Sequence, residues 1–263
     1  MRSVNWYHEV STEWLKARRF VITATEVSKL VPAYKRFQKA GDPDALAPEF
    51  AALWAEKHSD GDPDPSSYGP AARGHICEPW AVRAWNLQNT NRPFYHWDDC
   101  IIARNGVGFS PDAADVPQLL SAPIVSVDAF DLISSDDEKG QRAPREILEI
   151  KSYDAAHHMK CCIKDKAKHD ELMQLAVPFI VCPTIDKATL VFFNPNAPVQ
   201  MKAFTYTRDD LKEQIRMAEL IIMQWERTCR QCEEIAAEDS MSAMCTEDEI
   251  YDEFLSTIPF AGD

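Results

Sequence analysis

The stretch Leu148-Glu149-Ile150-Lys151 places a glutamate and a lysine two residues apart within an apolar run. On a β-strand such residues point to the same face, so the Glu149 carboxylate and the Lys151 ammonium would lie side by side. Charged groups in this setting need a partner or an ion. Asp112, in Ser110-Pro111-Asp112 upstream, supplies a second carboxylate if its strand is a neighbour. Two carboxylates beside an ammonium can hold a hard divalent cation and assist phosphodiester hydrolysis.

The overall composition fits one moderate-sized domain with an appendage. The chain has 263 residues, 45% of them hydrophobic, as is ordinary for a globular protein. No apolar run approaches the roughly 18–20 residues of a membrane span, and the N-terminal residues lack the apolar stretch of a secretory signal. The eight cysteines show no small-scaffold spacing, which favours reduced thiols. We therefore expect a cytoplasmic protein with no membrane association.

The net charge of −14 is distributed unevenly along the chain. Residues 233–263 contain ten acidic residues and no lysine or arginine, so the remainder carries only −4. Residues 1–39 hold eight Lys or Arg against three Glu, and five lysines fall within 151–168. A solvated helix face is the plain interpretation of such lysines. Basic regions next to a candidate metal site also suit a polyanionic substrate.

The hydrophobic periodicity predicts helices and strands that alternate around one mixed sheet. We expect a capped helix from Ser11, a turn at Thr23 and a second helix from Thr25. Further helical segments are expected at 48–58, 71–87 (with a kink at Pro79), 155–177 and 208–238. The expected strands are 94–103, 107–112, 124–133, 146–153 and 189–193, with a loop at 59–70 and a polar hairpin turn at 134–144. We therefore divide the chain into three parts. Residues 1–208 form a domain that includes N-terminal helices at 11–40. A long amphipathic helix follows at 209–238, and then an acidic tail at 239–263 with a short helix near 247–255.

Four motifs occur in an order that resembles a known family. They are Trp14-Leu15-Lys16-Ala17-Arg18 with Val21-Ile22-Thr23-Ala24-Thr25-Glu26-Val27, Gly74-His75-Ile76-Cys77-Glu78, Gly108-Phe109-Ser110-Pro111-Asp112-Ala113, and Leu148-Glu149-Ile150-Lys151. The chain resembles the phage-type recombination exonucleases, the lambda exonuclease or YqaJ-like group of the PD-(D/E)XK nuclease superfamily. This resemblance implies an α/β (α+β) restriction-endonuclease-like core, with a central mixed β-sheet flanked by helices.

The resemblance also implies a role for each site residue. Asp112 and Glu149, with the backbone carbonyl of Ile150 and with Glu78, would bind one or two Mg²⁺ ions, or Mn²⁺ in their place. Lys151 would position or deprotonate the attacking water. The other implied roles are binding of the DNA 5′-phosphate by Arg18 and Thr25, a backbone contact by Arg19, and an active-site position for Gln174.

Three departures from the family pattern leave alternatives open. Ala113 replaces a glycine. Thirty-six residues separate Asp112 from Glu149, where the family has a short hairpin, and Asp128 also resembles a nuclease aspartate at a strand start. The motif context favours Asp112 over Asp128. The helix that carries Gln174 is matched only in part.

By resemblance, the protein is expected to be a Mg²⁺-dependent 5′-to-3′ exonuclease of double-stranded DNA. It would leave 3′ overhangs for a single-strand annealing protein in phage-type homologous recombination, as a homotrimer in the bacterial cytoplasm, encoded by a phage or prophage. The alternatives are an endonuclease, an Fe–S-type repair nuclease that would use Cys229, Cys232 and Cys245, or a non-catalytic DNA-end-binding module. The acidic tail is either a docking segment or a solubilising one.

Overall fold

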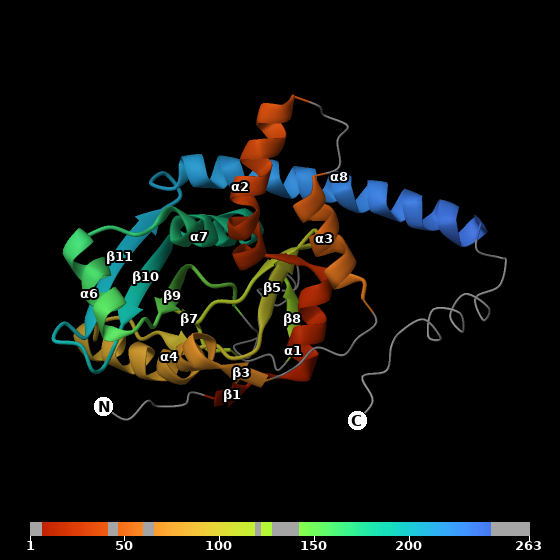
Figure 1. Cartoon of the computed structure of the whole chain (residues 1–263). Coiled ribbons are helices and arrows are strands. Elements are labelled where there is room, and N and C mark those ends of the chain that lie inside the picture. The colour runs from red at the N-terminus through yellow and green to blue at the C-terminus, as the bar shows by residue number, and fades with distance from the viewer. Residues whose placement is uncertain (1–6, 42–46, 60–65, 119–121, 128–141, 243–263) are drawn as a thin grey trace, which may run out of the picture.

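The central feature of the fold is a five-stranded mixed sheet between two layers of helices (Figure 1). The computed structural model describes residues 7–41, 47–59, 66–118, 122–127 and 142–242. The strand order in this sheet is β11-β10-β9-β7-β4, with β9 parallel to β10 and the other pairs antiparallel. These strands are β4 (Tyr95–His96), β7 (Ala113–Ala114), β9 (Glu146–Lys151), β10 (Lys187–Phe193) and β11 (Met201–Thr207).

A second, four-stranded sheet has the order β2-β6-β5-β8. Its strands are β2 (Ile22–Thr23), β5 (Ile101–Arg104), β6 (Val107–Phe109) and β8 (Ile124–Ser126). The expected central mixed sheet is therefore accompanied by a second one: the chain leaves the four-stranded sheet after Phe109 and joins the five-stranded sheet at Ala113. Pro111 has no N–H to donate to a ladder, and the Ser110 hydroxyl bonds the carbonyl of Cys100 at 2.6 Å. The link Ser110-Pro111-Asp112 thus lies where the two sheets meet.

Helices cover both faces of the five-stranded sheet, and β9 shows how the faces differ. Ile147 packs into the large core cluster with α7 (His169–Val181) and α8 (Lys212–Ser242). Leu148 and Ile150 pack on the opposite face against α4 (Gly69–Gln88). The period of two along the strand therefore places Glu149 and Lys151 on the same face as Ile147.

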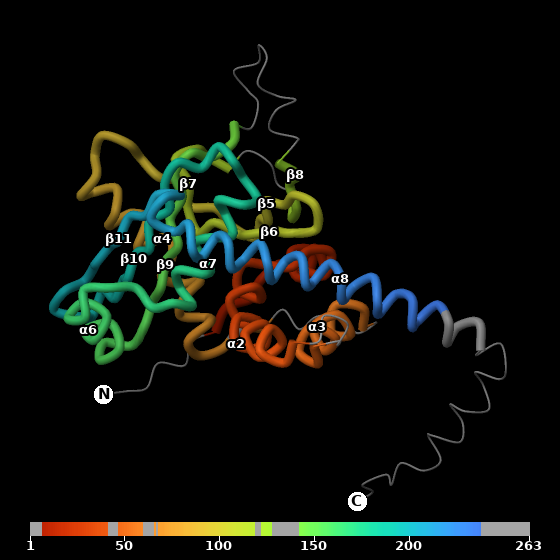
Figure 2. Tube along the Cα trace, turned by 90° about the horizontal axis from the view of Figure 1, so that it is seen from above, coloured from red at the N-terminus to blue at the C-terminus, as the bar shows by residue number. Residues whose placement is uncertain are grey.

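The N-terminal helices form a layer with α7 and α8. Figure 2 shows α8 crossing α7, α2 and α3, with its C-terminal end projecting beyond them. Among the helices that the structure describes, none has the length and apolar character needed to cross a membrane. The remaining elements are β1 (Tyr7–Glu9), α1 (Thr12–Ala17), the 3₁₀ turn η1 (Arg18–Phe20), α2 (Ala24–Ala40), α3 (Pro48–Lys57), β3 (Ser66–Tyr68) and α6 (Ala155–Lys164).

Most predicted helices are confirmed, with shifted limits. Ser11 caps α1 through a bond from the Trp14 N–H, and α2 begins with a capping box between Thr23 and Glu26. The helical region expected at 155–177 contains two helices, α6 and α7, and Asp165 between them has a positive φ of 51°. The final helix runs from Lys212 to Ser242, past its expected end at 238.

The strands were predicted less well. The segment expected at 94–103 is divided into β4 and β5 by a loop in which Asp99 has a positive φ of 44°. Strand β3 lies in the expected loop at 59–70, and β11 was not predicted because its side chains are all half-buried or exposed. Asp128, most of the hairpin turn at 134–144, part of the strand at 124–133 and the short helix near 247–255 lie outside the described residues.

Gly108 permits a close approach beside the link between the sheets. A Cβ at this position would lie 2.7 Å from Cγ2 of Ile101 and 3.1 Å from Cγ2 of Val21. Both distances are well inside ordinary van der Waals contact. Glycine at position 108, two residues before Ser110, therefore lets β6 pack tightly between β5 and the segment before β2.

Candidate active site

A cavity of about 180 Å³ gathers most of the residues singled out from the sequence. It is formed by the end of α1, the start of α2, one side of α4, the loop before β5, the link between the sheets, β9 and α7. The predicted site residues that line it are Arg18, Thr25, Glu78, Asp112, Glu149 and Gln174. The predicted residues in the lining are separated by up to 156 positions in the chain, from Arg18 to Gln174.

Asp112 lies against the strand that carries the glutamate and lysine. Its Oδ2 accepts a hydrogen bond from the backbone N–H of Ile150 at 2.5 Å. Burial raises the pKa of Asp112 well above its ordinary value, and the charges of Glu78 and Glu149 raise it further. This places Asp112 in the position expected for the second carboxylate, whereas Asp128 lies outside the described residues.

Glu149 and Lys151 form an ion pair on β9. The Lys151 Nζ lies 2.6 Å from Glu149 Oε1, and both side chains are about a fifth exposed. Burial lowers the pKa of Lys151, but the charges of Glu149, Asp112 and Glu171 outweigh it, so that the pKa is raised overall. The ammonium therefore lies beside the carboxylates, as the two-residue spacing predicts.

Glu78 projects from α4 between two histidines. Its Oε1 lies 3.6 Å from Nδ1 of His75, and its Oε2 lies 3.7 Å from Nε2 of His96. Burial raises the pKa of Glu78, but the two histidines lower it to about 2. The Glu78 carboxylate in turn raises the pKa of His75. The sequence analysis did not assign either histidine, although the i,i+3 spacing of His75 and Glu78 was visible.

The N-terminus of α2 and Arg18 face the cavity together. Thr23, Ala24 and Thr25 line it at the first turn of the helix, where backbone N–H groups and the helix dipole favour an anion. The Arg18 guanidinium carbon lies 4.7 Å from the Trp14 ring centre, a cation–π contact that orients the side chain. This pairing of an arginine with a helix N-terminus suits a phosphate group.

Gln174 enters the cavity from α7. Its Nε2 donates to the Ser28 hydroxyl at 3.4 Å, and that hydroxyl donates to the carbonyl of Thr25 at 2.9 Å. Within the described part of the chain, its buried Oε1 has no hydrogen-bond partner. Gln174 therefore ties α7 to the first turn of α2 at the wall of the cavity.

Arg19 lies apart from the other predicted residues. Its Nη1 donates to the carbonyl of Ser59 at 3.0 Å. It lines a separate groove between α1, α2 and α3. The structure thus does not bring Arg19 into the cavity, and its expected contact with the DNA backbone stays a prediction.

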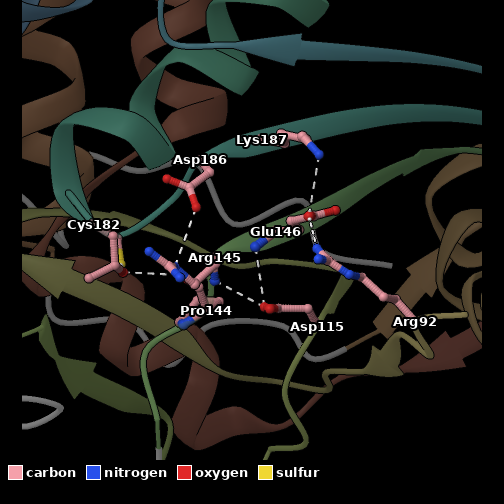
Figure 3. Close-up of polar contacts among 9 residues, drawn as sticks. Arg92, Asp115, Pro144, Arg145, Glu146, Cys182, Asp186 and Lys187 are labelled. Atoms are coloured by element: carbon pink, nitrogen blue, oxygen red, sulfur yellow. Dashed lines mark hydrogen bonds and ion pairs between the residues drawn. The ribbon is translucent and has the colours of Figure 1, made fainter.

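A network of ion pairs and hydrogen bonds anchors the start of β9 (Figure 3). Asp115 Oδ1 accepts from the backbone N–H groups of Arg145 at 2.9 Å and of Glu146 at 3.2 Å. Glu146 Oε1 lies 2.8 Å from Arg92 Nη1 and 3.5 Å from Lys187 Nζ. These contacts hold β9 between β7 and β10, and a one-residue slip would turn Glu149 and Lys151 to the opposite face.

The donor set fits a hard divalent cation that takes few protein ligands. Within the described residues, no three His, Cys, Asp or Glu side chains form a ready-made group of metal ligands. Mg²⁺ is typically bound by one or two carboxylates, with water and phosphate oxygens at its other positions. Asp112 and Glu149 with the Ile150 carbonyl match this pattern, and a cation there would offset the repulsion that raises the pKa of Asp112.

No protein-family model and no curated protein matches the chain. Its fold is nevertheless that of exonucleases of known structure. The alkaline exonuclease LHK-Exo from Laribacter hongkongensis superposes on this chain with a TM-score of 0.56. The structure of LHK-Exo in complex with dAMP superposes with a TM-score of 0.57. In both comparisons the identity is 18%, and the alignment covers 87% of this chain and 99% of that one. A phage related exonuclease from Haemophilus somnus 129PT has a TM-score of 0.47 at 11% identity, over 82% of this chain and 96% of that one. The two LHK-Exo structures confirm the α/β core expected from the resemblance to phage-type recombination exonucleases.

Proposed function

We propose that the protein is a Mg²⁺-dependent exonuclease that digests one strand of duplex DNA from its 5′ end. The observation that carries this proposal is the cavity itself. It combines an anion-binding end, formed by Arg18 and the first turn of α2, with the carboxylates Asp112 and Glu149. A cavity that would bind a terminal phosphate near the carboxylates suits the removal of nucleotides from a chain end.

The roles of the residues follow from their contacts. Asp112 and Glu149, with the Ile150 carbonyl and with Glu78 at their side, would hold the cation, which supplies Lewis-acid activation of water and phosphate. Lys151 has three donors, and Glu149 accepts one of them. The other donors can orient the attacking water and stabilise charge on the phosphate in the transition state. Gln174, which lines the same cavity, would hold the first turn of α2 in place through the Ser28 hydroxyl.

The wider biological role rests on the resemblance and the shared fold. LHK-Exo has been solved with dAMP, and a 5′-mononucleotide is the product expected here. The resemblance further supports 3′ overhangs for a single-strand annealing protein, a ring-like homotrimer that would make digestion processive, and action in the cytoplasm of a phage host. Of the three cysteines that the Fe–S alternative would use, Cys229 and Cys232 lie on α8 and Cys245 lies outside the described residues.

The proposed activity can be tested on end-labelled linear duplex and closed circular DNA. With Mg²⁺ we expect the linear duplex to be degraded to 5′-mononucleotides while the circle stays intact, and EDTA to stop the reaction because the carboxylates lose their cation. Label at the 5′ end should be released before label at the 3′ end, as measured by gel and thin-layer chromatography. Cutting of the circle would favour the endonuclease, and binding to ends without hydrolysis would favour the non-catalytic module.

A second prediction concerns the terminal phosphate. Replacing Arg18 with methionine should lower kcat/KM on 5′-phosphorylated ends by roughly 10- to 100-fold, since a hydrogen bond to a charged group contributes about 1.5–3 kcal/mol. The rate on 5′-hydroxyl ends should change little. Steady-state kinetics on the two substrates measure the ratio. Arg19→Met is the matched control: a nonspecific backbone contact would lower both rates alike and leave the ratio unchanged.

A further inference from the structure

A buried lysine underlies the anion-binding end of the cavity. Lys57 is the last residue of α3, and its side chain is only 6% exposed. Its Nζ lies 2.8 Å from the carbonyl oxygen of Arg18, 2.8 Å from that of Val21 and 3.0 Å from the Glu26 carboxylate. An ammonium has three N–H donors, so these contacts satisfy all of them.

The two carbonyls flank the 3₁₀ turn η1, which connects α1 to β2. Lys57 therefore fixes the turn at both ends, and Arg18 occupies the first of them. The third partner, Glu26, also accepts the backbone N–H of Thr23 at 2.7 Å in the capping box of α2. One ion pair thus links the backbone of Arg18 to the first turn of α2, the two features that would bind the terminal phosphate.

Stability alone does not account for this arrangement. The buried Lys57 ammonium and the largely covered Glu26 carboxylate lose much of their hydration, and an apolar pair of similar size is often as stable or more so. What an apolar pair cannot do is bond two carbonyls of an irregular turn and a helix cap at the same time. Lys57 does not line the cavity; it lines the adjoining groove with Arg18 and Glu26.

We infer that Lys57, paired with Glu26, is a positioning residue for the recognition of a 5′-terminal phosphate. It acts through the backbone of Arg18 and Val21 rather than by touching DNA. This inference rests on the proposed function, because it assumes that Arg18 and the α2 N-terminus bind that phosphate. It predicts that loss of Lys57 impairs the discrimination between phosphorylated and hydroxyl ends, beyond any loss of stability.

The test compares Lys57→Met and the charge-balanced Lys57→Met/Glu26→Gln with the wild-type protein. Glutamine at position 26 can still complete the capping box. The ratio of kcat/KM on 5′-phosphorylated duplex to that on 5′-hydroxyl duplex should fall by about tenfold in both variants. The control Lys212→Met removes an exposed lysine at the start of α8 and should keep the wild-type ratio. Circular dichroism establishes the folded fraction of each variant at the assay temperature.

The outcomes separate the inference from the proposed function. A merely structural role would lower both rates in proportion to the folded fraction and leave the ratio at the wild-type value, which would overturn the inference. If Lys57→Met does not fold, the ratio for Lys57→Gln, which keeps a donor, decides by the same criterion. A wild-type protein that digests both ends equally well would instead refute the assigned role of Arg18, and the inference with it.

Discussion

Replacing Asp112 with asparagine is expected to lower kcat on linear duplex DNA by about a thousandfold, which corresponds to about 4 kcal/mol of lost transition-state stabilisation. Asparagine keeps an oxygen that can accept the Ile150 N–H, so the link between the sheets should hold its geometry. It removes the negative charge that would bind the cation beside Glu149. Single-turnover kinetics in saturating Mg²⁺ measure the effect, with the thermal midpoint as the check on folding.

The matched variant is Asp128→Asn, since Asp128 is the alternative left open by the sequence. If Asp112 is the metal ligand, Asp128→Asn should retain most of the activity. Calorimetric titration with Mn²⁺ alone should show weakened binding in Asp112→Asn and unchanged binding in Asp128→Asn. An active Asp112→Asn beside an inactive Asp128→Asn would reassign the metal ligand to Asp128.

The sequence predicted the site best where one local rule decided the geometry. Glu149 and Lys151 share a face because strand side chains alternate, and their pairing at 2.6 Å follows directly. Ser11 begins a helix, as predicted, because its hydroxyl accepts a hydrogen bond from a free N–H group. The cap of α2 is Thr23, where a turn was predicted, and not Thr25. Asp112, Glu78 and Arg18 were assigned to the site because the four motifs occur in the order of the family that the chain resembles. No local pattern could have placed these three residues together.

The features that were missed depend on contacts between distant segments. His96 reaches Glu78 from a different element, and nothing in its own sequence context marks it. Lys57 at the end of α3 has the pattern of an ordinary basic residue in the last helical turn, yet its side chain is buried on the carbonyls of η1. The division into two sheets was missed because the strand pattern in the sequence continues across Pro111. In the structure the hydrogen-bonded ladder ends before the link Ser110-Pro111-Asp112.

Replacing Lys151 with methionine is expected to lower kcat by about a thousandfold, within the range found when a positioned acid, base or charge is removed. Methionine has a similar length and no donor, so water orientation and charge stabilisation are both lost. Glu149 is about a fifth exposed, so solvent can replace part of the lost ion pair, and the thermal midpoint should fall by only a few degrees. Binding of 5′-phosphorylated ends, measured by fluorescence anisotropy, should stay near the wild-type value, because Arg18 and the α2 N-terminus are intact.

Comparison with a second lysine variant distinguishes a catalytic role of Lys151 from a general contribution of positive charge to DNA binding. Lys160 is an exposed residue of α6 in the same lysine-rich region. Lys160→Met removes the same charge from the surface, so it should weaken DNA binding mainly at higher salt and leave kcat nearly unchanged. If the two variants lost kcat to the same small extent, Lys151 would be one more member of a basic surface. A large loss confined to Lys151→Met would instead assign the effect to the ammonium that Glu149 holds beside the carboxylates.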